Sequence, residues 1–172
     1  MKRGRLVLGA SCIAAGLLIT ASVARIPARM IYNPSASAPK GFYWIEHKVA
    51  FQRGEFVAAL PPEKAQILAS ERGYLPEAIP VLKTIYGVSG DLICIENGGV
   101  IVNEMRLAEV LERDSVGRQM PVQNGCYRLQ EGEYFLLSTK IPNSFDSRYF
   151  GPVGEDRILG VATPLAVFAK RK

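Results

Sequence analysis

The feature that most constrains this chain is an uncharged run of 19 residues near its start, LVLGASCIAAGLLITASVA at positions 6–24. As an α-helix with a rise of about 1.5 Å per residue, it would be roughly 28 Å long, enough to cross the hydrocarbon core of a bilayer. Three basic residues precede the run and favour a cytoplasmic N-terminus, although Arg25 and Arg29 beyond it weaken this asymmetry. We therefore expect the chain to contact membrane lipid through residues 6–24 and the body to lie outside the cytoplasm.

Two interpretations of this segment are open. It is either an uncleaved signal anchor or a signal peptide that is cut after Ala24, with Ser22 and Ala24 as the small residues that such a cut requires. The run is longer than the ~7–15 residues of a usual signal-peptide core, which favours the anchor. We accordingly divide the chain into an N-terminal signal segment, residues 1–25, and an extracytoplasmic body, residues 26–172.

The net charge of +5 suggests nucleic acid as a partner, but the charge is unevenly distributed. Residues 1–25 contain four of the 21 basic residues and none of the 16 acidic ones, so the other 147 residues hold 17 basic and 16 acidic side chains. The body is thus close to neutral, and its aromatic residues fall within strand-like patterns. We therefore expect no nucleic-acid partner.

The body has the pattern of a mainly β protein. Strands are predicted at 42–45, 54–60, 79–87, 91–96 and 100–104, followed by a last third in which strands alternate with turns. The break NGG at 97–99 is typical of a tight hairpin, and a helical stretch at 62–72 should stop at Gly73. Residues 104–119 fit either a short helix or an insertion. The predicted fold class is an antiparallel, mainly β domain with one or two short helices, tethered by an N-terminal transmembrane helix.

The body has few residues that could bind a metal ion. Its one histidine, His47, follows a strand-like stretch and is interpreted as a surface residue. Its two cysteines, Cys94 and Cys126, are too few for a structural metal site, and we expect no metal and no other cofactor. A disulfide between these cysteines is chemically possible if the body lies outside the cytoplasm.

A lysine interrupts the apolar strand predicted at 79–87. Strand alternation places Val81, Lys83 and Ile85 on one face, so the charge projects where apolar neighbours point. One interpretation is a lysine that extends from an edge strand to water. The other is a lysine in an apolar pocket, where a lowered pKa leaves a neutral amine that can activate a serine hydroxyl.

Three segments together resemble a known peptidase family. They are SASAPKGFYW (35–44), LKTIYGVSGDLI (82–93) and SFDSRYFG (144–151). In order and spacing they are similar to the three signature boxes of the S26 family of serine-lysine signal peptidases. More narrowly, they resemble the TraF-type peptidases of conjugative plasmid transfer, in which the pattern Ser-x-Pro-x-Gly-Phe-Tyr is typical.

The resemblance assigns roles to residues of the first two boxes. Ser37 matches the nucleophile, whose hydroxyl oxygen would attack the scissile carbonyl, and Lys83 matches the general base, which must be neutral to take the serine proton. Ser35 matches the side chain that joins the backbone N–H of Ser37 in the oxyanion hole. Losing such a donor typically costs about 3–4 kcal/mol of transition-state stabilisation.

The third box supplies supporting residues under the same resemblance. Ser144 matches a serine that orients the lysine amine, and Asp146 and Arg148 match an acidic and basic pair that braces the site. Arginine cannot act as a base, because its guanidinium does not deprotonate in proteins. A carboxylate beside the lysine would raise the pKa of the amine, so we expect Asp146 to support the site without transferring a proton.

The resemblance implies a membrane-tethered serine endopeptidase that cleaves exported precursor proteins after small residues, with a conjugative pilin subunit as the expected substrate. Water or the substrate's own amine could resolve the acyl-enzyme, and the latter would give a cyclic product. We expect the domain on the periplasmic face of a bacterial inner membrane, or free in the periplasm if the first segment is removed. The alternative is a non-catalytic envelope scaffold of a conjugative transfer or secretion apparatus.

Overall fold

The computed structural model describes residues 29–35 and 37–168. The expected membrane segment, residues 1–25, lies outside the described residues. Among those that are described, no helix is long and apolar enough to cross a membrane.

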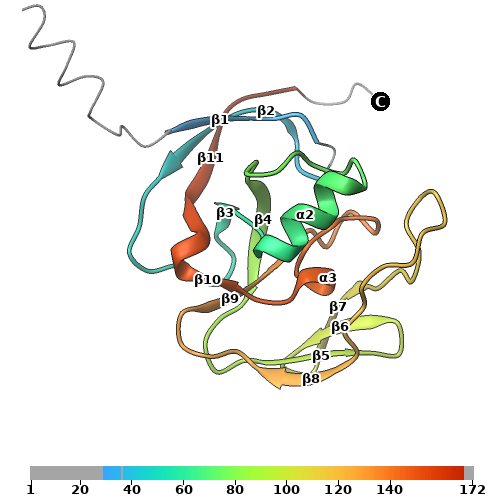
Figure 1. Ribbon diagram of the computed structural model, residues 1–172. Helices are drawn as coiled ribbons and strands as arrows, with labels where there is room; N and C mark the ends of the chain where they lie inside the picture. Colours follow the sequence, from blue (N-terminus) through green and yellow to red (C-terminus); the bar gives the residue numbers. More distant parts are fainter. Residues whose placement is uncertain (1–28, 36, 169–172) are drawn as a thin grey trace, which may run out of the picture.

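The described chain is mainly β, as predicted, and every strand pair in it is antiparallel. A seven-stranded sheet has the order β1-β2-β11-β3-β4-β9-β10, and a four-stranded sheet has the order β7-β6-β5-β8 (Figure 1). The strands of the large sheet are β1 (Met30–Asn33), β2 (Lys40–Glu46), β3 (Phe56–Ala59), β4 (Val81–Gly87), β9 (Glu133–Leu137), β10 (Val153–Gly154) and β11 (Ile158–Phe168). Those of the small sheet are β5 (Leu92–Glu96), β6 (Gly99–Val102), β7 (Met105–Glu109) and β8 (Gly125–Arg128).

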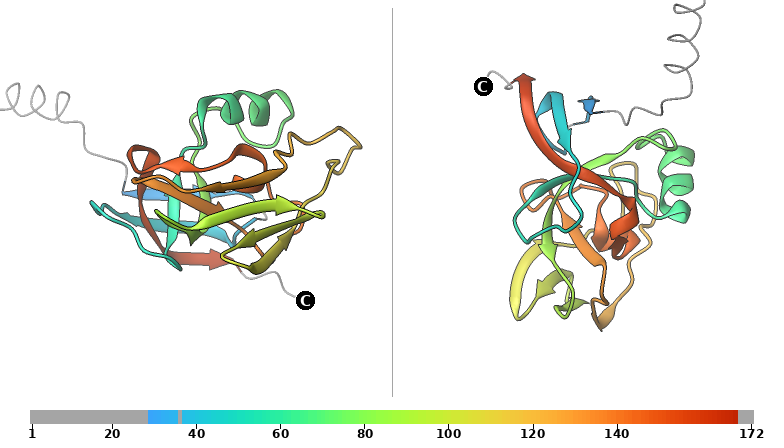
Figure 2. Two further views of the ribbon diagram at one scale, coloured as in Figure 1. Left: turned by 90° about the horizontal axis from the view of Figure 1, so that it is seen from below. Right: turned by 90° about the vertical axis from the view of Figure 1, so that its left-hand side faces the viewer.

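The helices are short and lie beside the large sheet. They are α2 (Glu63–Glu71), α3 (Ser147–Phe150) and the 3₁₀ helix η1 (Glu155–Arg157). Helix α2 confirms the helix predicted at 62–72, and the chain leaves it through Gly73, whose φ of 70° few other residues adopt. Figure 2 shows the small sheet at one end of the molecule and β1, β2 and β11 at the other.

Two segments differ from simple expectations. Residues 104–119 form strand β7 and a loop, so the helix alternative for this segment is wrong. The reason is that β7 completes a ladder with β6, which satisfies its backbone and buries Ala108 against Val100. The third box, in a region expected to alternate strands and turns, contains the one-turn helix α3.

Strand β9 lies between the two halves of the core. Phe135 and Leu137 pack against the small sheet, whereas Tyr134 and Leu136 pack against the side chains of β3 and β4. Both faces of β9 are therefore covered, which explains its continuous apolar sequence. Ser138 follows directly after the last residue of β9.

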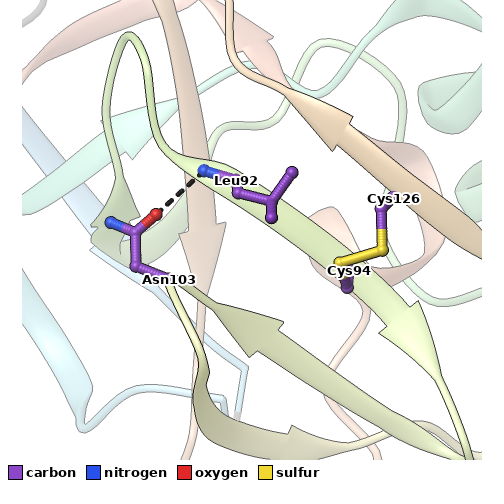
Figure 3. The surroundings of a disulfide bond; sticks show 4 residues. All are labelled: Leu92, Cys94, Asn103 and Cys126. Carbon is purple, nitrogen blue, oxygen red and sulfur yellow. Dashed lines mark hydrogen bonds between the residues drawn. A yellow bond between two sulfur atoms is a disulfide. The ribbon is translucent and has the colours of Figure 1, made fainter.

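A disulfide joins Cys94 of β5 to Cys126 of β8 (Figure 3). The two residues are direct partners in the ladder of the small sheet. On the other side of β5, the side-chain oxygen of Asn103 accepts a hydrogen bond of 2.9 Å from the backbone N–H of Leu92. These contacts secure the small sheet, whose strand β5 begins at the last two residues of the second box.

Candidate active site

The loop between β1 and β2 carries Ser35 and Ser37, and the side chain of Asn33 holds it. Asn33 Nδ2 donates to the carbonyl oxygens of Ser35, Ala38 and Pro39 at 3.1–3.2 Å. Its Oδ1 accepts from the backbone N–H of Ser35 at 3.1 Å. Asn33 is itself buried, so one fixed amide determines the course of the loop.

The two loop serines are joined to each other. Ser35 Oγ donates to Asn33 Oδ1 at 2.8 Å, and the Oγ atoms of Ser35 and Ser37 lie 3.0 Å apart. Because a hydroxyl has one proton and that of Ser35 is directed to Asn33, the Ser37 hydroxyl is the donor in the second bond. Within the described residues, no hydrogen bond joins Ser37 Oγ to Lys83 Nζ.

Lys83 lies on β4 and is paired with Val57 of β3. Its side chain is only 1% exposed, so the alternative of a lysine that extends to water is wrong. Nζ donates to Ser144 Oγ at 2.8 Å and to Ser138 Oγ at 3.2 Å. Burial lowers the pKa of Lys83 from 10.5 to about 8; Asp146 opposes this change, and Arg148 contributes to it.

Asp146 and Arg148 form a fully buried ion pair. Arg148 Nε donates to Asp146 Oδ1 at 2.7 Å, and Nη2 donates to Oδ2 at 3.0 Å. The carboxylate also caps α3, accepting from the backbone N–H of Arg148. The guanidinium donates further to the carbonyl oxygens of Glu109, Pro142 and Ser138. The pair thus ties the third box to β7 and to the end of β9.

A cavity of about 280 Å³ connects these groups. Ser35, Ser37, Lys83 and Ser144 all line it. The segment between α2 and β4 adds the mostly apolar side chains of Tyr74, Leu75, Pro76 and Ile79, and the loop after β7 adds both apolar and charged ones. A second hollow of about 230 Å³ also borders Ser35 and Ser37. The structure therefore brings the residues of all three boxes to one place, with Asp146 and Arg148 buried behind it.

Two residues of this site have no part in the sequence-based prediction. Asn33 precedes a proline at the end of a strand, where an asparagine commonly stabilises a turn, so a local signal for it exists. Ser138 accepts from Lys83 Nζ and donates to the carbonyl oxygen of Ser37 at 3.2 Å. No local signal predicts Ser138, because its contacts are with residues far away in the sequence.

Other candidate residues lie apart from this cavity. His47 is exposed, as expected, on the segment after β2. Among residues 29–35 and 37–168, no group of three or more His, Cys, Asp or Glu side chains is placed to hold a metal ion.

Comparison with known proteins extends the resemblance of the three boxes to the whole chain. The profile of the family described as signal peptidase, peptidase S26 matches residues 2–166. The plasmid transfer protein TraF of Escherichia coli is 32% identical over 143 residues, which cover 77% of this chain and 80% of that protein. The probable conjugal transfer protein TraF of Sinorhizobium fredii is 30% identical over 184 residues, which cover 98% of this chain and 93% of that protein.

Among the solved structures, a signal peptidase I from Enterococcus faecalis V583 is similar to this chain. The two are 23% identical, with a TM-score of 0.40, over 69% of this chain and 99% of that one. The family profile and the two relatives confirm the resemblance that the three boxes suggested. On the profile match, which spans nearly the whole sequence, the chain belongs to the signal peptidase S26 family.

Proposed function

We propose that this chain is a serine endopeptidase in which Ser37 is the nucleophile and Lys83 is the general base. One observation carries the proposal: the Lys83 amine is buried, its pKa is lowered to about 8, and it lines the same cavity as the Ser37 hydroxyl. A lysine with a pKa of about 8 is neutral in roughly one molecule in ten at pH 7, whereas a lysine in water is neutral in roughly one in several thousand. Burial therefore supplies the neutral amine that a lysine base requires.

The reaction has two steps. In the first, neutral Lys83 takes the Ser37 proton as Oγ attacks the scissile carbonyl, and the resulting ammonium gives that proton to the departing amine, leaving an ester on Ser37. In the second, water or the substrate's own amine gives a proton to Lys83 and attacks the ester, and the proton returns to Ser37 Oγ. Water releases a linear product, and the amine releases a cyclic one.

The first step requires a small rearrangement of the loop serines. The Ser37 hydroxyl must turn from Ser35 toward Lys83, and the Ser35 hydroxyl must turn from Asn33 toward the developing oxyanion. Both changes are rotations of a side chain or hydroxyl, and such bonds commonly tighten only when substrate is bound. The backbone N–H of Ser37 would be the second donor to the oxyanion.

An extended substrate fits the free edge of β4. Strand β4 pairs with β3 along Val81–Thr84 but with β9 only from Thr84 onward, so the second edge of Val81–Lys83 has no partner strand among the described residues. Val81 borders both hollows. A precursor segment added to this edge would form backbone hydrogen bonds while its side chains enter the hollows. Since the relatives are named for plasmid or conjugal transfer, we propose a pilin precursor of such a system as the substrate.

An exposed apolar face supports a location at a membrane surface. Met30 pairs with Trp44, and Tyr32 pairs with Phe42, so these side chains share one face of the β1–β2 hairpin. We call the exposed side chains of this region the outer apolar face: Met30, Tyr32, Phe42, Trp44 and Phe168. The apolar run 6–24 ends only a few residues before β1, and the basic residues 170–172 follow β11. Lipid is the partner that fits aromatic side chains beside basic ones, here at the periplasmic face of the inner membrane.

Coexpression with a candidate pilin precursor, followed by mass spectrometry, tests the peptidase. We expect wild type to produce the mature subunit, and a product lighter by one water than the linear fragment would indicate cyclisation. Ser37→Ala and Lys83→Ala should leave the precursor uncut, whereas the exposed controls Ser89→Ala and Lys140→Ala should process it normally. Normal maturation by a folded Ser37→Ala variant, together with normal transfer, would refute the mechanism and favour the scaffold alternative.

A further inference from the structure

Ser138 contacts both halves of the proposed dyad. Its Oγ accepts a hydrogen bond of 3.2 Å from Lys83 Nζ and donates one of 3.2 Å to the carbonyl oxygen of Ser37. Ser138 and Ser37 are 101 residues apart in the sequence. One hydroxyl therefore connects the base on β4 with the backbone of the nucleophile loop.

The number of hydrogen bonds that Lys83 Nζ donates determines the direction in which its lone pair points. A neutral amine has two N–H groups and one lone pair, arranged nearly tetrahedrally. Ser144 accepts one N–H at 2.8 Å and Ser138 accepts the other at 3.2 Å. With both donors engaged, the lone pair has a single direction left, which is the condition for accepting the proton of one particular hydroxyl. With Ser144 alone, the second N–H and the lone pair could exchange between the two remaining positions on Nζ.

The buried ion pair fixes the backbone on which this hydroxyl stands. The N–H of Ser138 donates to Asp146 Oδ2 at 3.0 Å, and its carbonyl oxygen accepts from Arg148 Nη2 at 3.2 Å. Within the described residues, neither Asp146 nor Arg148 forms a hydrogen bond with Lys83 or Ser37. Besides the direct effect of their charges on the pKa of Lys83, their hydrogen-bonded link to the dyad passes through the backbone of Ser138.

We propose that Ser138 is a positioning residue that aims the Lys83 lone pair and holds the nucleophile loop, and that Asp146 and Arg148 act on the dyad through its backbone. This inference rests on the proposed Ser37/Lys83 mechanism. It gives the ion pair a function other than proton transfer. It also assigns a role to Ser138, which is not among the dyad, oxyanion-hole and supporting residues that the family resemblance identifies.

The test uses the full chain in detergent, with a pilin precursor as substrate, and compares three variants. Ser138→Ala removes both hydrogen bonds, Ser138→Thr keeps the hydroxyl, and Thr139→Ala removes a neighbouring hydroxyl that instead contacts Tyr86 at 3.0 Å. We expect Ser138→Ala to lower kcat by about tenfold or more with little change in KM, because proton transfer loses its alignment. Ser138→Thr should recover most of this loss, and Thr139→Ala should resemble wild type.

A second readout does not depend on cleavage. Since the Ser138 oxygen stabilises the ammonium form of Lys83, its removal should lower the pKa of Lys83 and shift the acid limb of the pH–rate profile to lower pH. Titration of the Lys83 side-chain carbon by NMR, assigned with Lys83→Ala, measures this directly. If Ser138 had only a structural role, Ser138→Ala would change neither the pKa of Lys83 nor the acid limb of the pH–rate profile.

The outcomes separate this inference from the proposed function. Suppose that wild type does not cleave the precursor. If Ser138→Ala then still shifts the Lys83 titration and Thr139→Ala does not, the peptidase proposal fails and the Ser138–Lys83 contact stands. If wild type cleaves in a Ser37-dependent way while folded Ser138→Ala keeps its kcat and its Lys83 titration, the Ser138 inference is overturned. A loss of kcat that Ser138→Thr does not restore, without a change in titration, overturns it as well.

Discussion

Replacing Lys83 by methionine should reveal how much stability the buried amine costs. Methionine has a similar length but no charge, so the variant removes the desolvation penalty and keeps most of the packing. Burial lowers the pKa of Lys83 from 10.5 to about 8 in the folded chain, whereas the unfolded chain keeps the ordinary value. A shift of this size corresponds to about 3 kcal/mol of folding free energy.

The sign of the effect depends on pH. Below pH 8 the amine is charged in both states, and the folded state bears the whole penalty. As the pH rises from about 8 to 10.5, the folded chain loses its proton first and the penalty disappears, so the stability of wild type increases across this range. Methionine cannot donate to Ser138 and Ser144, and the loss of two hydrogen bonds costs about 2 kcal/mol at every pH.

Together these contributions predict a crossover. At pH 7, Lys83→Met should be more stable than wild type by about 1 kcal/mol, and above pH 10.5 it should be less stable by about 2 kcal/mol. Urea unfolding of the full chain in a mild detergent between pH 7 and 10.5 measures the difference, with exposed Lys140→Met as the matched control. A difference that stays constant over this range, or the same change in the Lys140 variant, would refute the burial argument for Lys83.

Changes at Asn33, at the disulfide and on the outer apolar face should have separate effects. Asn33→Ala should slow precursor cleavage by about tenfold or more and cost about 1–3 kcal/mol in urea unfolding, because the carbonyl oxygens of the nucleophile loop lose their donor; unchanged cleavage would contradict this. Cys94→Ala/Cys126→Ala should lose about 2–4 kcal/mol in urea unfolding, since the disulfide spans a sequence separation of 32. It should keep its cleavage rate without urea, and a loss of cleavage there would mean that the small sheet affects the dyad. In a chain beginning at residue 26, Trp44→Glu should reduce cosedimentation with anionic lipid vesicles and Val116→Glu should not; equal binding by both would exclude the outer apolar face as a lipid contact.

The strands and turns were predictable because their signals are local. Short aromatic or apolar runs predicted β2 and β4, and Asn97-Gly98 adopts the positive φ angles, 48° and 67°, that a tight hairpin requires. The order of the sheet was not predictable, since β11 inserts between β2 and β3 by pairing with residues about a hundred or more positions earlier. Such pairings depend on the assembled core and leave no trace in a short window of sequence.

The site was predictable only in part, for a similar reason. Spacing alone could not decide whether Lys83 reaches water, because its burial depends on the end of β9 and on the third box covering β4. The three boxes located the side chains that belong together, but a serine such as Ser138 is common in turns. Only the fold shows that its hydroxyl lies between the base and the nucleophile loop.

An aspartate near the lysine base looks counterproductive, since a carboxylate raises the pKa of a neighbouring amine. The buried ion pair resolves the conflict. Both carboxylate oxygens of Asp146 accept from Arg148, so the negative charge that Lys83 experiences is largely balanced by a positive charge equally fixed in place. Asp146 raises the pKa of Lys83 and Arg148 lowers it, which leaves burial as the dominant influence. The arginine thus permits an aspartate to cap α3 and hold Ser138 a short distance behind an amine that must stay neutral. Neither member of the pair could do this alone, because an unpaired charge at either position would be buried without compensation.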